Sequence, residues 1–174
     1  TVVALTALLT AVDNGTQSAL MVPTEILAEQ HYLNIRPFCE NLGLEIKLVT
    51  SALKGKERKS HFEDIQSGKT QIVVGTHSLI QKDIQFKNLG LAVIDEQHRF
   101  GVMQREAIGK KGDQPHLLIM TATPIPRSLA LTLYGDMDVS LLDEFPPGRQ
   151  EIATNLFFEN RREQAYAIME KQLQ

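Results

Sequence analysis

Two adjacent carboxylates, Asp95 and Glu96, stand directly after the apolar run Leu91-Ala92-Val93-Ile94. Such a run predicts a buried strand, so the two acids are expected at its carboxyl end. There they can divide two tasks, one holding a Mg²⁺ ion that bridges phosphates and the other orienting an attacking water. The alternative is that they only begin the next helix, whose dipole favours acids by a few tenths to about 1 kcal/mol.

Three further apolar runs end in segments with small, hydroxyl or glycine residues. Each segment can bind a phosphate through backbone N–H groups, side-chain oxygens or a helix N-terminus. Taken singly, each segment is an ordinary turn or helix cap. Their shared position at predicted strand ends favours one phosphate-binding edge. The segments are Val22-Pro23-Thr24-Glu25, Val74-Gly75-Thr76-His77 and Met120-Thr121-Ala122-Thr123-Pro124.

Other clusters of polar side chains support weaker predictions. The densest basic cluster, Lys54, Lys56, Arg58 and Lys59, can reach a DNA phosphate, but such runs more often mark a solvated helix start. The five histidines permit a metal-dependent hydrolase. No pair, however, has the His-Glu-x-x-His spacing that places two ligands on one helical face, which disfavours that class.

The elements that must position these residues follow from hydrophobic periodicity. Helices are predicted over residues 2–12, 24–42 and 55–67, the second with Thr24 as N-cap and a kink at Pro37. Apolar strands are predicted over residues 19–22, 44–50, 72–74, 91–94 and 117–120. Buried strands alternating with helices are typical of a doubly wound α/β domain, in which ligands bind at the carboxyl ends of parallel strands.

A change in composition near residues 145–149, Phe-Pro-Pro-Gly-Arg, predicts a stiff connection between two domains. A strand is expected after it over residues 151–158, and a charged helix over residues 160–174. The final 25 or so residues are therefore expected to open a second domain.

Composition limits the class of protein further. The 174 residues carry a formal net charge of -3, so any contact with nucleic acid must be local. The only cysteine, Cys39, cannot form an internal disulfide, and no long uncharged apolar stretch indicates a membrane span, so a cytoplasmic location is expected. Residues 1–9 lack the basic leader of a signal peptide. Because residue 1 is not Met, the chain is expected to begin inside a longer protein.

The ordered set of strand-end segments resembles motifs Ia, Ib, II and III of superfamily 2 helicases, over nearly the whole chain. Within that superfamily, longer strings resemble the RecG type of bacterial DNA helicase. They are Asp-Glu-Gln-His-Arg-Phe-Gly-Val from Asp95, Thr-Pro-Ile-Pro-Arg from Thr123 and Asp-Glu-Phe-Pro-Pro-Gly-Arg from Asp143. The transcription-repair coupling translocase shares parts of the first two strings and stays an alternative, whereas Gln97 and the Pro-Pro-Gly-Arg string favour the RecG type.

The resemblance implies a fold and a division into domains. Residues 1–145 would form a RecA-like motor lobe of the P-loop NTPase fold that lacks its N-terminal strand and phosphate loop. Residues 146–150 would connect two lobes, and residues 151–174 would begin the second.

The resemblance also implies a site that uses ATP and Mg²⁺. Thr1 and Asp95 would bind the nucleotide-bound Mg²⁺, Glu96 would orient the attacking water, and His98 would link the nucleotide site to DNA contacts. The implied DNA-binding residues are Pro23, Thr24, Glu25, Gly75, Thr76, His77, Thr121, Thr123 and Arg127. Without the upstream Gly-Lys of the phosphate loop, the chain alone is expected to bind nucleotide weakly and hydrolyse none.

By the same resemblance, the parent protein would couple ATP hydrolysis to movement on duplex DNA and to branch migration or fork regression in repair and recombination. Its implied partners are branched or duplex DNA, a second motor lobe and a junction-reading domain of the same chain, in a monomer. The rival hypothesis is a non-hydrolysing nucleic-acid-binding or regulatory module that keeps the motor fold. The residues upstream of Thr1 discriminate between the two.

Overall fold

The computed structural model describes residues 1–96, 99–100, 102–123, 137–144, 148 and 154–173. The chain forms two compact units, residues 1–125 and 126–174, and each is described by itself. The predicted boundary at residues 145–149 lies within the second unit, and the domain division stays a prediction.

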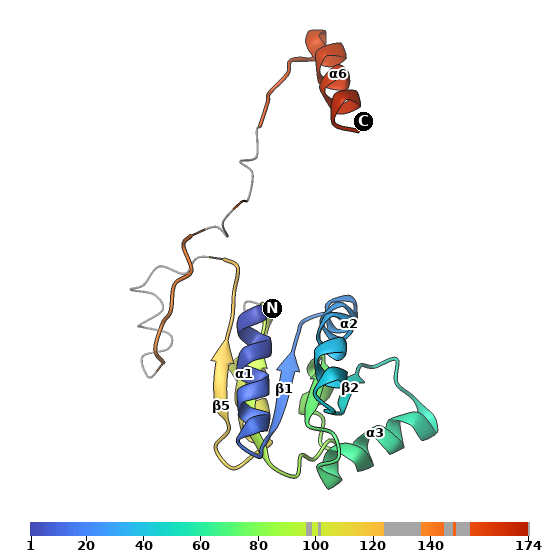
Figure 1. Ribbon diagram of the computed structural model, residues 1–174, viewed down its shortest axis with the longest axis vertical. Coiled ribbons are helices and arrows are strands. Elements are labelled where there is room, and N and C mark those ends of the chain that lie inside the picture. Colours follow the sequence, from blue (N-terminus) through green and yellow to red (C-terminus); the bar gives the residue numbers. More distant parts are fainter. Residues whose placement is uncertain (97–98, 101, 124–136, 145–147, 149–153, 174) are drawn as a thin grey trace. The chain divides into compact units, whose positions relative to one another are not determined.

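The first unit is built on a five-stranded parallel sheet with the strand order β2-β3-β1-β4-β5 (Figure 1). Because every pairing is parallel, all five carboxyl ends lie at one edge of the sheet, which is here called the carboxyl edge. The predicted doubly wound α/β fold is confirmed. The strands are β1 (Gln17–Met21), β2 (Ile46–Val49), β3 (Ile72–Gly75), β4 (Leu89–Ile94) and β5 (His116–Ile119).

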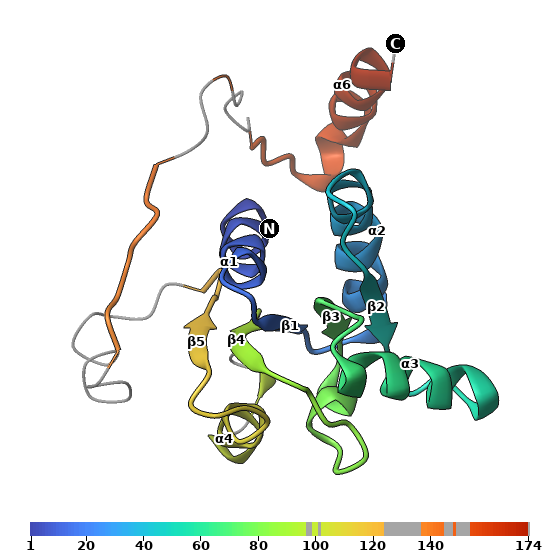
Figure 2. The ribbon, with the colours of Figure 1, turned by 60° about the horizontal axis from the view of Figure 1, so that its bottom comes forward.

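Helices cover both faces of this sheet (Figure 2). On one face, α1 (Val2–Asp13) and α2 (Glu25–Asn41) pack their buried side chains against strand residues such as Leu20 and Val93. On the other face lie α3 (Gly55–Ser67), the short 3₁₀ helix η1 (His77–Ile80) and α4 (Val102–Gly109). Burial on both faces explains why the strands are apolar throughout rather than alternating.

Helix α2 begins where its cap predicts. The Thr24 hydroxyl accepts a hydrogen bond from Leu27 N at 3.3 Å, which satisfies one of the first free amides of the helix. The helix continues through Pro37 to Asn41. Its buried side chains recur at helical spacing and form one stripe facing the sheet: Ala28, His31, Ile35 and Cys39.

At the opposite edge of the sheet, Gln17 joins three segments of the chain. Its side-chain amide is 4% exposed and makes four hydrogen bonds to backbone groups. Nε2 donates to the carbonyls of Ile65 and Thr70, and Oε1 accepts from the amides of Lys87 and Asn88, all at 2.7–3.0 Å. All the donor and acceptor capacity of a buried amide is therefore used, which makes its burial inexpensive.

The second unit contains a 3₁₀ helix, η3 (Glu159–Arg161), followed by α6 (Arg162–Leu173). The predicted C-terminal helix is confirmed. The predicted strand over residues 151–158 is wrong for residues 154–158, which form no strand. A strand needs a partner, and the described part of this unit offers none, so Leu156 and Phe158 stay 86% and 74% exposed. No helix in the described ranges has both the length and the apolar character required to cross a membrane.

Candidate functional site

The segments at the carboxyl edge are joined by backbone hydrogen bonds that continue the sheet one residue past each strand. Every strand-end segment predicted to carry chemistry takes part. The bonds run from Val22 N to Gly75 O (2.9 Å), from Asp95 N to Met21 O (3.0 Å), from Thr76 N to Val49 O (3.3 Å) and from Met120 N to Ile94 O (2.8 Å). The starts of these four strand-end segments are therefore held together by one continuous set of backbone hydrogen bonds.

Asp95 follows β4, and both of its carboxylate oxygens are engaged. Oδ1 accepts a hydrogen bond from the Glu96 amide at 2.9 Å, and Oδ2 lies 3.1 Å from Nε2 of His31 on α2. The Asp95 side chain keeps 24% of its surface exposed, whereas the His31 side chain keeps only 9%. The carboxylate is thus fixed in orientation and still open to solvent on one side.

The charge state of Asp95 follows from these contacts. The hydrogen bond from His31 lowers the pKa of Asp95, burial opposes this, and the Glu96 amide lowers the pKa further. Asp95 is therefore an anion at neutral pH, so the His31 nitrogen that faces it donates the hydrogen bond.

Glu96 has an unusual backbone conformation. Its φ is +52°, in the left-handed region that side chains other than glycine seldom adopt. Such strain costs on the order of 1–3 kcal/mol, and it persists where the surroundings hold the residue in place, often at functional sites.

Thr1 and the start of α1 lie at the same edge of the sheet as the strand ends (Figure 1). Thr1 is the N-cap residue of α1, is exposed, and makes no side-chain bond to cap the helix. The first amides of this 12-residue helix and the positive end of its dipole favour an anion. The start of α1 and the acid pair Asp95 and Glu96 therefore lie on the same side of the first unit.

The oxygen atoms at this position suit Mg²⁺. Magnesium is usually bound by one or two carboxylates together with water and phosphate oxygens, not by an all-protein cage. The Asp95 carboxylate and the Thr1 hydroxyl match that pattern. Among the residues with described positions, no group of three His, Cys, Asp or Glu side chains converges as a metal cage would require. These residues fit an ion that arrives with a phosphate ligand.

The segment after β1 carries the predicted contacts Pro23, Thr24 and Glu25. Thr24 is exposed at the first turn of α2, with its hydroxyl accepting from within the helix. The Glu25 carboxylate accepts hydrogen bonds from both the amide and the hydroxyl of Ser51, in the segment after β2. These bonds, chiefly the one from the Ser51 hydroxyl, lower the pKa of Glu25. Glu25 thus ties two strand-end segments together.

The segment after β3 has a compact turn. Thr76 is 2% exposed, and its hydroxyl accepts from Ser78 N at 3.4 Å, which caps η1. Gly75 is buried where a side chain would collide with the backbone oxygen of Val49. His77 is exposed beside them. Of the three predicted contacts in this segment, His77 is the side chain open to a ligand.

The segment after β5 places two hydroxyls together. Thr121 Oγ1 and Thr123 Oγ1 are 2.8 Å apart, and the Thr123 amide donates to Thr121 Oγ1 at 3.3 Å. Thr121 is partly buried and Thr123 exposed. Gln97, His98, Arg127 and Arg149 lie outside the described residues, and so does the predicted link from His98 to these two threonines.

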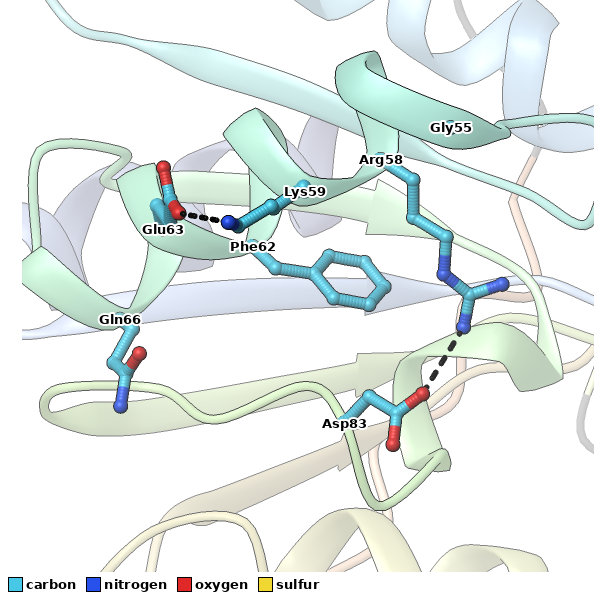
Figure 3. Close-up of a pocket in the computed structure, with 7 residues that line it drawn as sticks. All are labelled: Gly55, Arg58, Lys59, Phe62, Glu63, Gln66 and Asp83. Carbon is cyan, nitrogen blue, oxygen red and sulfur yellow. Dashed lines mark hydrogen bonds and ion pairs between the residues drawn. The ribbon is translucent and has the colours of Figure 1, made fainter.

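The basic cluster at the start of α3 is divided between internal and exposed side chains. Arg58 lies 4.9 Å from the ring centroid of Phe62 and donates to Asp83 Oδ2 at 3.5 Å (Figure 3). It also donates to Gln81 Oε1 at 2.8 Å. Arg58, Phe62 and Asp83 line an open pocket of about 300 Å³. Lys54 and Lys56, by contrast, are exposed. Arg58 therefore serves packing within the domain.

Sequence reasoning missed two residues of this frame, His31 and Ser51. His31 contacts Asp95 across 64 residues of sequence, and Ser51 contacts Glu25 across 26. The available signal for His31 was a histidine within the otherwise apolar stripe of α2. No local pattern marks Ser51.

Comparison with known proteins identifies the class. Residues 1–132 match the DEAD/DEAH box helicase family, and the chain belongs to that family. It is similar over nearly its whole length to proteins named ATP-dependent DNA helicase RecG. The Aquifex aeolicus relative is 49% identical, with 99% of this chain and 22% of the relative covered. The Pasteurella multocida relative is 53% identical, with 96% of this chain and 25% of the relative covered. The Escherichia coli K12 relative is 51% identical, with 93% of this chain and 24% of the relative covered. The chain thus spans about a quarter of its relatives' length.

Solved structures share the fold at low sequence identity. Cas3 from T. fusca has a TM-score of 0.57 and 19% identity, with 76% of this chain and 18% of that chain covered. The Mycobacterium smegmatis helicase Lhr, solved with single-stranded DNA and AMP-PNP, has a TM-score of 0.53 and 17% identity, with 67% and 16% covered. These likenesses support the RecA-like helicase motor fold.

Proposed function

We propose that this chain is the first motor lobe of a RecG-type, ATP-dependent DNA helicase. The parent protein would couple ATP hydrolysis to movement on duplex DNA, and so drive branch migration or regression of forks and junctions in repair and recombination. The observation that carries the proposal is the placement of Asp95 and Glu96 at the end of β4, on the same edge as the start of α1 and the other strand-end segments. The similarity to RecG proteins supports it.

The residues of this edge would divide the work. Thr1 and Asp95 would hold Mg²⁺, and the first turn of α1 would face the phosphates. When bound, Mg²⁺ neutralises charge on the β- and γ-phosphates. Glu96 would orient and polarise the attacking water, for which its strained backbone conformation sets the direction. His98 would link this site to the threonine pair.

Contacts to DNA would lie on the strand-end segments. Exposed groups such as Thr24, His77 and Thr123 would face the phosphate backbone, and Arg127 is proposed as a further contact. Gly75 and Glu25 would act on DNA through the shape of the segments they hold. Pro23, Thr76 and Thr121 complete the proposed set.

The proposal includes the surroundings of the lobe. Residues 1–145 would be the first lobe, residues 146–150 the connection and residues 151–174 the start of the second lobe. A junction-reading domain elsewhere in the parent would supply specificity for branched DNA. We place the parent in the cytoplasm, in keeping with the free thiol of Cys39. We further propose that the parent is a monomer.

The test is ATP hydrolysis by the parent protein at the length of its relatives, with linear duplex DNA and with forked DNA. Fork-stimulated turnover is expected. Glu96→Gln should reduce it by about 10²- to 10⁴-fold, because the amide cannot accept the proton of the attacking water.

A matched control makes the same chemical change at a remote position. Glu63→Gln on α3 loses an exposed contact of 3.8 Å to Lys59 and should keep wild-type turnover. Absence of DNA-dependent turnover in the wild type would exclude the helicase and leave the non-hydrolysing binding module.

A further inference from the structure

His31 is a buried polar ring in an apolar stripe. It is 7% exposed, and its neighbours on the sheet-facing side of α2 are Ala28, Ile35 and Cys39. Nε2 lies 3.1 Å from Asp95 Oδ2, while Nδ1 is buried without a hydrogen-bond partner among the described residues. Among the described residues, the bond to Asp95 is thus the one hydrogen bond that this ring makes.

Packing alone does not account for a histidine here. A buried nitrogen without a partner costs about 1–3 kcal/mol, which an apolar side chain of similar size would avoid. The bond to Asp95 Oδ2 is the interaction that an apolar replacement would lose. The hydrogen bond to Asp95 is therefore what explains a histidine at this position.

The bond completes the orientation of the proposed Mg²⁺ ligand. Glu96 N holds one oxygen of Asp95 and His31 Nε2 holds the other, so the plane of the carboxylate is fixed by two donors from different elements. Partners of this kind orient a metal ligand and raise the affinity for the metal.

The same bond connects Asp95 to the first turn of α2. His31 follows Thr24 by seven residues, which is two helical turns, or about 10 Å, along one side of the helix. The first turn also holds the segment after β2 through the bond from Ser51 N to Glu25 Oε1, 2.9 Å long. A rigid helix therefore joins the proposed nucleotide site to the proposed DNA-contacting segment after β1 and, through Ser51, to the segment after β2.

We infer that His31 is a positioning residue that orients Asp95 and couples the nucleotide site to the DNA contacts through helix α2. This inference rests on the proposed function. This coupling path runs through α2 to the segment after β1. The path proposed through His98 leads instead to the threonine pair after β5, so the two paths are separate.

The test compares His31→Phe with His31→Gln in the parent protein. Phenylalanine keeps a ring of similar size without a donor, and glutamine keeps an N–H group near the position of Nε2. Two quantities are measured: the Mg²⁺ concentration for half-maximal ATP hydrolysis, and the ratio of duplex DNA affinities with and without AMP-PNP.

His31→Phe is expected to raise the half-maximal Mg²⁺ concentration by about 10- to 100-fold. It should also bring the ratio of DNA affinities close to one while leaving nucleotide-free DNA affinity unchanged. His31→Gln should restore part of both effects. Ile35→Val, one turn along the same buried stripe, loses a methylene and should leave both readouts at the wild-type value.

A measurement on the wild-type protein keeps the inference testable if the variants fold poorly. In histidine-labelled protein, the ring ¹⁵N signals of His31 should show a protonated Nε2 and should shift when Mg²⁺-ADP is added. A bare Nε2, or wild-type Mg²⁺ dependence and wild-type DNA coupling in His31→Phe, would overturn the inference. Loss of DNA-dependent turnover in the wild type itself would instead refute the proposed function.

Discussion

Replacing Gly75 by alanine would put a methyl group where the ends of β2 and β3 already touch. An ideal Cβ at this position lies 2.3 Å from the backbone oxygen of Val49 and 2.9 Å from Cδ2 of Leu79. Ordinary contact begins at about 3.4 Å, so the oxygen would have to move by about 1 Å. It cannot do so freely, because it accepts a hydrogen bond from Thr76 N at 3.3 Å, and Leu79 is fully buried.

The expected cost is that of an overpacked core, about 1–3 kcal/mol. With a urea dependence of about 2 kcal/mol per M, the midpoint of unfolding should fall by roughly 1 M. The assay is urea denaturation of the 174-residue chain and of its Gly75→Ala variant, followed by far-ultraviolet circular dichroism.

Gly109→Ala provides the matched control. Gly109 ends α4, and an added Cβ there has no atom within 4 Å. The same chemical change should be neutral or stabilising by up to about 1 kcal/mol, because alanine has less freedom to lose on folding. Equal midpoints for both variants would refute the argument from overlap with Val49.

Two further stability predictions concern the frame around the site. Gln17→Leu should lower the free energy of unfolding by about 2–4 kcal/mol in the same urea assay, because buried backbone groups lose their partners. The control Gln66→Leu loses only an exposed bond to Gln85 and should change that free energy by less than about 0.5 kcal/mol. Burial raises the pKa of Asp64, but its ion pairs with Lys47 and Lys69 outweigh this and hold the pKa below the ordinary value. The stabilisation from these ion pairs is therefore present above about pH 4 and is lost as the pH falls through the pKa of Asp64 in the folded state. The difference in free energy of unfolding between wild type and Asp64→Asn should accordingly shrink from pH 7 to about pH 2. A difference that stays constant over this range would contradict the prediction.

The sheet could be predicted because its strands are covered on both faces and are therefore apolar throughout. Helix α3 could be placed from Gly55 to Ser67 because Gly68, at φ +79°, ends it with a left-handed cap. Helix α4 was not predicted, since eight residues are too few to show a helical period. The strand over residues 151–158 was predicted from local composition, which contains no information on whether a partner strand is present.

The contacts of the site show the same limit. The acid pair, the caps and the strand-end segments are local in sequence and could be recognised there. The bond from His31 to Asp95 and the four bonds of Gln17 join residues 48 to 71 positions apart. The folded topology determines such partners. A sequence pattern can therefore show only that a polar residue stands at a position where an apolar one is expected.

The hydrogen bonds that extend the sheet past its strands restrict how the chain can change in length. One residue inserted into β1 or β4 would move the following segment by about 3.3 Å against its neighbours and turn each side chain to the other face. Four segments would lose alignment together, because each is bonded to the next. A change of length is therefore expected to destabilise the fold most at the carboxyl edge, where these bonds lie.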